Sequence, residues 1–315
     1  MQEELKKILI ALKYFGRIDR TLFENMSYDS YRLRLKVLKW MDCIDLIEGI
    51  VKPGRKFDKC LEIFDLKEES LKRNDNGEVA YLLLGDIHIG RKSSSFNYDV
   101  AVKRMNIIID RVMQLKSQGY RILGFGLGDY IDGAGIYGRQ AYEQEFDPNI
   151  QMVKFVEFIS PLMDVIDGFY GISGNHGRVN DDELANYDYL AMETLRTMYK
   201  NKVVGSSRYV DIFDINGEKF LLAHMKFRMN YGIPDYSIRR FIFNQFLRYK
   251  DLSYIFMGHY HTFKVWNESD ILVVLNGTFL SDDELSQQYG FKSSISQTFI
   301  IKNGKKIIIE EIGLE

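Results

Sequence analysis

The hydrophobic pattern from residue 79 onward predicts strands that alternate with helices. Apolar runs begin at residues 79 and 121, and the segment between them, 98–120, has the spacing of an amphipathic helix. Continuous apolar runs are typical of strands buried on both faces, and their alternation with helices indicates parallel βαβ units. A third unit repeats this plan, with a helix expected around residues 150–166 and the apolar run GFYGIS after it.

The pattern becomes rich in strands after a helix expected near residues 181–200. Several apolar β-runs follow, one helix is expected near residues 235–250, and a last hairpin turns at Asn303–Gly304. Hairpins that follow βαβ units predict a mixed sheet. We therefore expect residues 80–315 to form an α/β domain built on a layered, mixed β-sheet.

The first 72 residues have a different rhythm and are expected to form a small separate domain. Three helical segments occupy residues 3–41, and two β-like runs follow around a turn at Pro53–Gly54. Helices followed by a hairpin resemble a winged helix-turn-helix domain, and a small helical domain used for dimerisation or protein contact is the alternative. The polar segment 73–79 contains an Asn-Gly turn signal and is the expected linker.

Basic residues recur on the third helical segment and near the turn of the hairpin. Helical spacing predicts that Leu35 and Leu38 face the core while the basic residues share another face. The net charge over residues 1–75 is only +2, from 16 basic and 14 acidic residues, so a nucleic-acid surface would have to be local. Its candidate residues are Arg32, Lys36, Lys39, Arg55 and Lys56.

Composition indicates an ordinary folded, soluble protein. The 315 residues have a formal net charge of −2, so overall charge gives no general attraction to nucleic acid or membranes. Only two cysteines occur, which makes a disulfide framework unexpected and favours a reducing cytoplasm. No apolar stretch has the length of a membrane span, and the amino-terminal run, interrupted by Lys13, differs from a signal peptide. We expect a cytoplasmic protein without a membrane partner.

Five short motifs end predicted strands, and four of them contain all five histidines of the chain. The motifs are GDIH (85–88), GDYID (128–132), GNH (174–176), AHM (223–225) and GHYH (258–261). Open α/β sheets place their sites beyond the carboxyl ends of strands, so these motifs are expected to converge. Oxygen and imidazole donors without cysteine sulfur suit Mn, Fe, Zn or Mg.

The order of these motifs resembles that of the calcineurin-like metallophosphoesterase superfamily, over most of residues 80–280. Each motif alone is common, whereas five in this order form a specific match. The resemblance implies two divalent metal ions, with manganese the first expectation. It implies that Asp86, His88 and His261 hold one ion, that Asn175, His224 and His259 hold the other, and that Asp129 bridges them.

The resemblance also implies a hydrolytic mechanism. A water between two such ions is acidified and attacks phosphorus in line. His176 is then not a ligand but protonates the leaving oxygen, and Asp132 orients it. For Asp132 the alternative is a solvated residue that stabilises a turn.

Departures from the superfamily pattern bear on the substrate. Gly133 and Gly177 stand where many protein phosphatases have arginine and glutamate, which weakens the phosphoprotein hypothesis. The capping domain of the DNA-repair nucleases has no equivalent after GHYH. Loops 133–146 and 225–237 interleave aromatic and basic residues, which suits single-stranded nucleic acid but also an ordinary lid. Candidate substrate contacts are Arg178, Arg139, Lys226 and Arg228.

The sequence therefore predicts a two-metal phosphodiesterase acting on nucleic acid, nearest to the DNA-repair nucleases. Three alternatives stay open: a phosphomonoesterase acting on phosphoprotein or nucleotide, a DNA-binding regulator without turnover, and a scaffold with a replication or repair protein as partner. DNA versus RNA, exo- versus endonuclease activity, the metal loaded and the oligomeric state are not decided.

Overall fold

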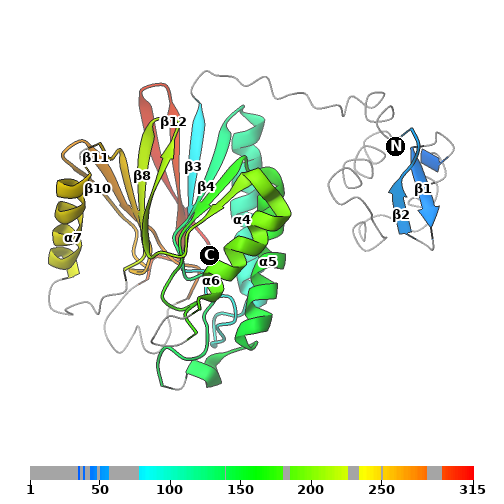
Figure 1. Ribbon diagram of the computed structural model, residues 1–315, viewed down its shortest axis with the longest axis horizontal. Helices are drawn as coiled ribbons and strands as arrows, with labels where there is room; N and C mark the ends of the chain where they lie inside the picture. Colours follow the sequence, from blue (N-terminus) through cyan, green and yellow to red (C-terminus); the bar gives the residue numbers. More distant parts are fainter. Residues whose placement is uncertain are drawn as a thin grey trace. The chain divides into compact units, whose positions relative to one another are not determined.

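The protein was examined as a computed structural model, which describes residues 35, 38–39, 43–47, 50–56, 78–138, 140–179, 185–225, 234–249, 251–281 and 293–315. The chain divides into two compact units, Met1–Asp75 and Asn76–Glu315 (Figure 1). None of the helices in these described ranges is long and apolar enough to cross a membrane.

The described part of the first unit contains helical residues and one hairpin. Leu35 and Leu38 are buried, and the neighbouring Lys39 is exposed, as the helical spacing predicts. Strand β1 (Ile44–Ile47) pairs antiparallel with β2 (Ile50–Pro53), with Ile47 opposite Ile50. The residues before Pro53 were expected to form one run. They form two strands instead, which pair with each other antiparallel.

Two other expectations concern this unit. Most of the three helical segments and the second β-run lie outside the described residues, so the winged-helix hypothesis stays a prediction. Cys43 is disulfide-bonded, which corrects the use of the low cysteine count as a sign against disulfide bonding. Cysteine spacing in a sequence does not show which sulfur atoms approach one another in space, which is why composition failed here.

The second unit contains a six-stranded mixed sheet. In spatial order its strands are β13 (Lys306–Gly313), β12 (Ser296–Asn303), β3 (Val79–Leu84), β4 (Arg121–Gly126), β5 (Gly168–Gly171) and β6 (Val203–Gly205). Strands β3 to β6 are parallel to one another, while β12 pairs antiparallel with both β3 and β13. The expected βαβ units and terminal hairpin are therefore parts of a single sheet.

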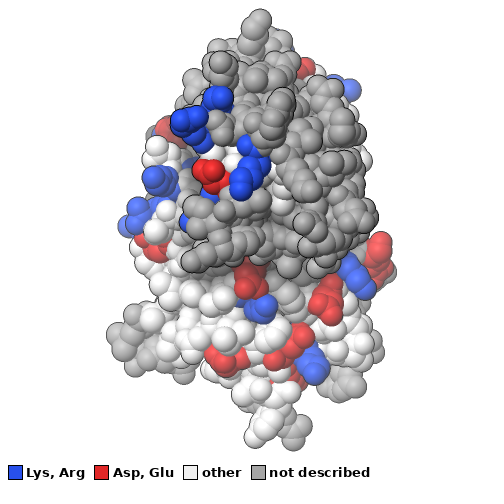
Figure 2. Space-filling model, turned by 90° about the vertical axis from the view of Figure 1, so that its right-hand side faces the viewer, with Lys and Arg blue, Asp and Glu red and all other residues white. Residues whose placement is uncertain are grey.

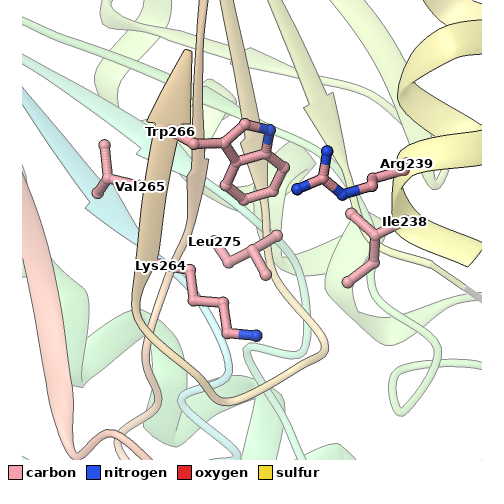
Figure 3. A pocket seen from close by; sticks show the side chains of 6 residues that line it. All are labelled: Ile238, Arg239, Lys264, Val265, Trp266 and Leu275. Carbon is pink, nitrogen blue, oxygen red and sulfur yellow. The ribbon is translucent and has the colours of Figure 1, made fainter. Parts of the chain in front are cut away.

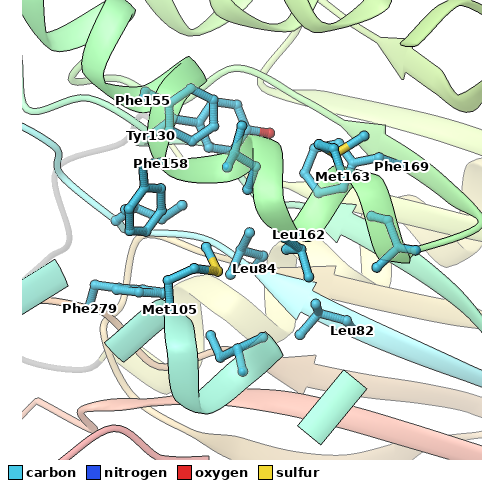
Figure 4. Packing of buried hydrophobic residues seen from close by; sticks show 14 of the residues in the cluster. Leu82, Leu84, Met105, Tyr130, Phe155, Phe158, Leu162, Met163, Phe169 and Phe279 are labelled. Carbon is cyan, nitrogen blue, oxygen red and sulfur yellow. The ribbon is translucent and has the colours of Figure 1, made fainter. Parts of the chain in front are cut away.

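Three helices cover one face of this sheet: α4 (Tyr98–Ser117), α5 (Pro148–Val165) and α6 (Tyr187–Tyr199) (Figure 1). Short 3-10 turns, η2 (Gln140–Glu143) and η3 (Lys200–Lys202), precede α5 and follow α6. Side chains of Asn97 and Asp147 cap the first two helices by accepting backbone N–H bonds, which fixes where they begin. The core between helices and sheet is rich in aromatic, Leu and Met side chains (Figure 4).

A second, five-stranded sheet packs against the other face. Its order is β10 (Lys264–Glu268), β11 (Ile271–Leu275), β9 (Tyr254–Met257), β8 (Glu218–Ala223) and β7 (Val210–Ile215). Phe125 and Phe220 stack between the two sheets with ring centroids 4.8 Å apart. Helix α7 (Pro234–Arg248) packs on the outer face of this sheet, so the unit has four layers, helix–sheet–sheet–helix (Figure 1).

Candidate metal centre

Five loops meet where parallel strands of the two sheets end. Residues 85–88 follow β3, 127–132 follow β4, 172–176 follow β5, His224 follows β8, and 258–261 follow β9. The loops are joined by backbone hydrogen bonds: Ile87 N–H and His88 N–H both donate to Asp129 O, at 2.9 and 3.0 Å. Each motif named from the sequence therefore lies at one edge of the two-sheet core, as parallel strands require.

The backbone of these loops is unusual at the candidate ligands themselves. Asp86, His88, Asp129, His259 and His261 have φ angles of 52°, 54°, 51°, 79° and 52°. Positive φ is uncommon for residues other than glycine, although Asp and His tolerate it better than most. Each such residue costs of order 1–3 kcal/mol and persists only where its surroundings hold it, and such residues cluster at functional sites.

Asp86, His88 and His261 form the first cluster, with one potential ligand atom each and all three within 4.8 Å of one another. Asp86 Oδ1 lies 3.2 Å from His261 Nε2, and His88 Nε2 lies 3.3 Å from His261 Nε2. The Asp86 carboxylate also accepts the His259 backbone N–H at 2.9 Å. The Nε2 atoms of His88 and His261 face each other. A cation bound between them and the Asp86 carboxylate would accept the lone pairs of both nitrogens.

Asp129, His224 and His259 form the second cluster, again within 4.8 Å. His224 Nε2 is 3.1 Å from Asp129 Oδ2 and 3.0 Å from the amide oxygen of Asn175. On the far side of its ring, His224 Nδ1–H donates to Leu127 O at 2.7 Å. A backbone carbonyl can only accept, so Nε2 is the nitrogen left to bind a metal, as is usual for ligating histidines.

Asp129 lies between the two clusters. Its Oδ2 is 3.9 Å from His88 Nε2 in addition to its contact with His224, and its Oδ1 accepts the His176 backbone N–H at 2.7 Å. The structure thus brings together all seven residues expected to bind metal. Carboxylate, imidazole and amide donors without sulfur form a chemically suitable set for two hard or borderline divalent ions.

The neighbouring carboxylates and burial shift the pKa values of the buried histidines in opposite directions. Burial disfavours protonation of His224, but the Asp129 carboxylate outweighs it and raises the pKa of His224 to about 9. Burial, followed by the charge of His224, lowers the pKa of His259 to about 3. Burial raises and the histidines lower the pKa of Asp129, with a net result well below its ordinary value. Metal binding at these donors would therefore displace the proton of His224.

Asp132 contacts both a candidate ligand and the expected proton donor. Its Oδ1 accepts from His88 Nδ1 at 2.9 Å and lies 3.2 Å from His176 Nδ1, whose N–H also reaches Asp132 O at 3.0 Å. Burial alone would raise the pKa of Asp132. The hydrogen bonds from His176 and His88 outweigh burial, so the pKa lies below its ordinary value. Despite burial, Asp129 and Asp132 together raise the pKa of His176 to about 9.

Two glutamines outside the sequence motifs hold Asp132, and a third, Gln151, holds one of them. Gln140 Nε2 donates to Asp132 O at 2.6 Å, and Gln144 Nε2 donates to Asp132 Oδ2 at 2.5 Å. The buried Gln151 accepts the Gly133 N–H at 2.8 Å and donates to Gln144 Oε1 at 2.8 Å. The sequence contained one signal for this group: Gln151 lies on the apolar face of a predicted helix, where a polar side chain is unexpected.

Asp188 is a second residue that the sequence did not reveal. It is fully buried in the first turn of α6, where it accepts N–H groups of Tyr130 and Ile131 at 3.2 and 3.3 Å and of Gly174 at 2.8 Å. These bonds tie the loop after β4 to the loop after β5. Burial and the charge of Asp129 raise the pKa of Asp188 to about 7.

The remaining predicted contacts lie elsewhere or outside the described residues. Arg178 is half-buried, forms a backbone bridge with Asn186, and its charge acts on the Tyr209 hydroxyl. Lys39, Arg55 and Lys56 are exposed on the first unit, and Figure 2 shows both basic and acidic side chains among the described residues in view. Outside the described ranges lie the other five candidate contacts: Arg32, Lys36, Arg139, Lys226 and Arg228.

Comparisons with known proteins give matches of fold only. No family model matches the chain, and no curated protein matches it. Among solved structures, a Vps29 variant from Entamoeba histolytica is 14% identical, with 74% of this chain and 91% of that chain covered and a TM-score of 0.40. A predicted phosphoesterase from Streptococcus pneumoniae is 13% identical, with 75% and 90% covered and a TM-score of 0.37. An archaeal phosphodiesterase is 11% identical, with 74% and 100% covered and a TM-score of 0.40. We draw no functional conclusion from similarity at this level.

Proposed function

We propose that this protein is a two-metal-dependent phosphodiesterase that hydrolyses nucleic acid, with the chemistry of the calcineurin-like metallophosphoesterases that its motifs resemble. The observation that carries the proposal is the pair of donor clusters around Asp129, with His176 and Asp132 beside them. A purely structural role for these histidines would leave unexplained why five strained backbone positions coincide with five of the donors.

In this proposal Asp86, His88 and His261 hold one ion, Asn175, His224 and His259 hold the second, and Asp129 bridges. The chemistry supplied by two bound ions is activation of a water and neutralisation of phosphate charge. The chain's own contribution is rigidity: hydrogen bonds from Asp132 to His88 and from His224 to Leu127 O fix which ring nitrogen faces inward.

His176 is the proposed general acid. Its Nδ1–H is directed at Asp132, so Nε2 is the nitrogen available to the leaving oxygen. With its pKa near 9 in the metal-free site, His176 has a proton to give at neutral pH, and two bound cations would shift that pKa downward. The Tyr137 ring lies 6.3 Å from that of His176, and the Arg91 guanidinium lies 5.8 Å from the centre of the Tyr137 ring, with its charge paired to Glu143 at 2.6 Å.

Nucleic acid is the proposed substrate because aromatic and basic side chains are available around the centre and on the first unit. Tyr142, 91% exposed, and Tyr137, 38% exposed, belong to the loop that also carries Gln140 and Gln144. Exposed aromatic rings can stack on unpaired bases. Exposed Lys39, Arg55 and Lys56 are suited to phosphate contacts. A role in DNA repair and a replication or repair protein partner remain predictions of the same kind.

The test is hydrolysis by the full chain, loaded with manganese, of four substrates: single-stranded DNA, RNA, bis(p-nitrophenyl) phosphate and a phosphopeptide. We expect turnover of the diesters, with His176→Asn reducing the rate on DNA by about 10²–10⁴-fold while metal content stays the same. Asn175→Ala should instead lower metal content. Cleavage of the phosphopeptide alone would favour a phosphomonoesterase. Full metal loading without any turnover would favour a regulator or scaffold.

A further inference from the structure

Strand β13 lies at the edge of the six-stranded sheet, where only one of its two sides has a neighbouring strand. Within the described part of the chain it pairs with β12 alone, in the terminal hairpin drawn in red in Figure 1. The outer side of an edge strand presents a row of backbone N–H and C=O groups that can pair with a further strand. β13 is therefore a possible site for another β-strand to bind.

The other described strands at sheet edges are shorter. Strands β6, β7 and β10 have three, six and five residues, whereas β13 has eight. Length matters because the number of hydrogen bonds between two strands increases with it. One face of β10 is also covered by α7, with Trp266 and Arg239 lining a pocket of about 270 Å³ between them (Figure 3). Among these edges, β13 offers the longest row of backbone groups.

Both faces of β13 expose isoleucine. Ile307 and Ile308 are each 44% exposed, and successive residues of a strand project to opposite faces. Ile309 packs against the core between the two sheets, and Ile312 packs against the core beneath the three helices. Ile307 and Ile308 thus extend these two apolar faces into solvent. Contact with branched side chains of a neighbouring strand would remove them from water and stabilise the pairing.

The charges of β13 are separated along the strand. Lys305 and Lys306 lie at its beginning, and Glu310 and Glu311 lie towards its end. Both lysines are exposed, and within the described residues neither has an acidic partner. Glu310 is 2.8 Å from Arg111 of α4 and is still partly exposed. An antiparallel copy of the same strand would bring lysines to glutamates at both ends, whereas a parallel copy would bring like charges together.

One register of such a pairing matches every central position. If Ile308 lies opposite Ile308 of a second copy, antiparallel geometry places Ile307 opposite Ile309. The same register places Lys306 opposite Glu310, and by symmetry this ion pair occurs twice. Isoleucine therefore meets isoleucine at the centre, and opposite charges meet on each side of it.

The neighbouring registers do not match in this way. A shift by one residue puts Glu310 opposite Ile307 or, in the other direction, Lys306 opposite Ile309. In the matched register Lys305, just before the strand, lies opposite Glu311. The order of side chains along β13 thus favours one antiparallel alignment with itself over its neighbours.

We propose that β13 is a dimerisation edge: two copies of this chain pair their β13 strands antiparallel, about a two-fold axis at Ile308, and join their six-stranded sheets into one. A two-fold interface requires a patch that is complementary to itself, as the lysine and glutamate ends of β13 are. Antiparallel pairing reverses every strand, so the two donor clusters face opposite ends of the joined sheet. The inference does not depend on the proposed function, because it uses no residue of the metal centre.

The test exchanges charges at the two ends of the strand in the full chain. Lys306→Glu places a glutamate opposite Glu310 of the second copy, and Glu310→Lys places a lysine opposite Lys306. Each variant alone should raise the Kd of the dimer by about tenfold or more. An equimolar mixture of the two should form the dimer again, because one copy then has only glutamates at these positions and the other only lysines.

Sedimentation velocity over a concentration series measures the mass and the Kd. The matched control is Lys103→Glu, which makes the same charge change at an exposed residue of α4 and should leave the Kd at the wild-type value. Recovery on mixing separates a lost interface from a folding defect, since a misfolded variant would not regain association from its counterpart.

Three results would overturn the proposal. A wild-type chain that stays monomeric throughout the concentration series shows that the edge does not pair. A dimer with the wild-type Kd in both charge variants is formed by another surface. Variants that dissociate separately and stay apart when mixed rule out the antiparallel alignment of Lys306 with Glu310.

Discussion

His88 is contacted from both ends of its imidazole ring. Asp132 lies 2.9 Å from Nδ1, and His261 Nε2 lies 3.3 Å from Nε2. Because the same Asp132 oxygen is also 3.2 Å from His176 Nδ1, a single carboxylate orients one candidate ligand and the candidate acid. A small rotation of Asp132 would disturb both rings at once. The groups that hold Asp132 are therefore expected to matter for catalysis although they touch neither metal nor substrate.

Replacing Gln144 tests this residue-scale coupling. Gln144→Ala removes the donor 2.5 Å from Asp132 Oδ2, and a hydrogen bond to a charged group is worth ~1.5–3 kcal/mol. We expect kcat on DNA to fall by about tenfold, with a smaller loss on bis(p-nitrophenyl) phosphate, whose good leaving group needs less protonation. Rates on both substrates are measured. The exposed Gln118 offers a control as Gln118→Ala, and equal losses on the two substrates would argue against a positioning role.

The sequence identified the donors but not the residues that hold them. Histidines and aspartates in GDIH, GDYID and GHYH are recognisable because rare residue types recur at strand ends. Gln140, Gln144 and Asp188 are common residue types in common positions. Their contacts with Asp132 and with the backbone of Gly174 depend on how three loops fold over one another, which local patterns do not encode.

Among elements, the loops after β4 and β5 approach so closely that a side chain would not fit between them. A Cβ atom added to Gly174 would lie 2.0 Å from Asp129 N and 2.1 Å from Asp129 Oδ1. Both contacts are with the residue proposed to bridge the metals. The glycine in GNH is thus required by packing between two loops, and its absence of a side chain determines where the Asp129 carboxylate lies.

Gly174→Ala is therefore expected to weaken metal binding more than it weakens folding. Overpacking of this kind costs about 1–3 kcal/mol and is relieved by moving Asp129, so we expect manganese affinity to drop by about tenfold or more. Calorimetric titration measures the affinity, and thermal unfolding of the metal-free chain measures the stability. Gly135→Ala is the control, because nothing lies within 4 Å of its added Cβ. Unchanged manganese affinity in Gly174→Ala would contradict this account.

Element boundaries were predictable where local signals exist. Helices expected at 98–120, 150–166 and 235–250 are observed at Tyr98–Ser117, Pro148–Val165 and Pro234–Arg248. Caps and helical spacing are local features, so a single sequence contains them. The division of the strands into two sheets does not follow from local signals. Strand β12 joins β3 across more than two hundred residues, and no pattern in either strand names the other as its partner.

At the scale of the whole molecule, the metal-free protein concentrates opposing charges in its centre. Three buried carboxylates, Asp86, Asp129 and Asp132, face histidines of which His176 and His224 have pKa values raised to about 9. Protonation of these two rings stabilises the metal-free fold. Bound cations would supply the same charge without depending on pH, which links metal loading to stability.

The sign of that link can be worked out from the pKa shifts. A histidine whose pKa rises from 6.5 to about 9 on folding contributes stability that is complete below pH 6.5 and lost as pH rises through 9. Asp188, raised from 3.8 to about 7, also favours the folded state less as pH rises from about 4 to 7. The metal-free chain should therefore become less stable between pH 6.5 and 9.

Manganese should oppose this loss. Because binding must displace the proton of His224, affinity increases with pH, and the stabilisation by a fixed manganese concentration should be larger at pH 9 than at pH 6.5. Thermal unfolding at both pH values, with chelator and with manganese, measures the effect. His224→Asn should remove most of the manganese response and part of the pH dependence. A metal-free Tm that rises toward pH 9, or a manganese response larger at pH 6.5, would mean that these imidazoles are not the groups that exchange protons for metal.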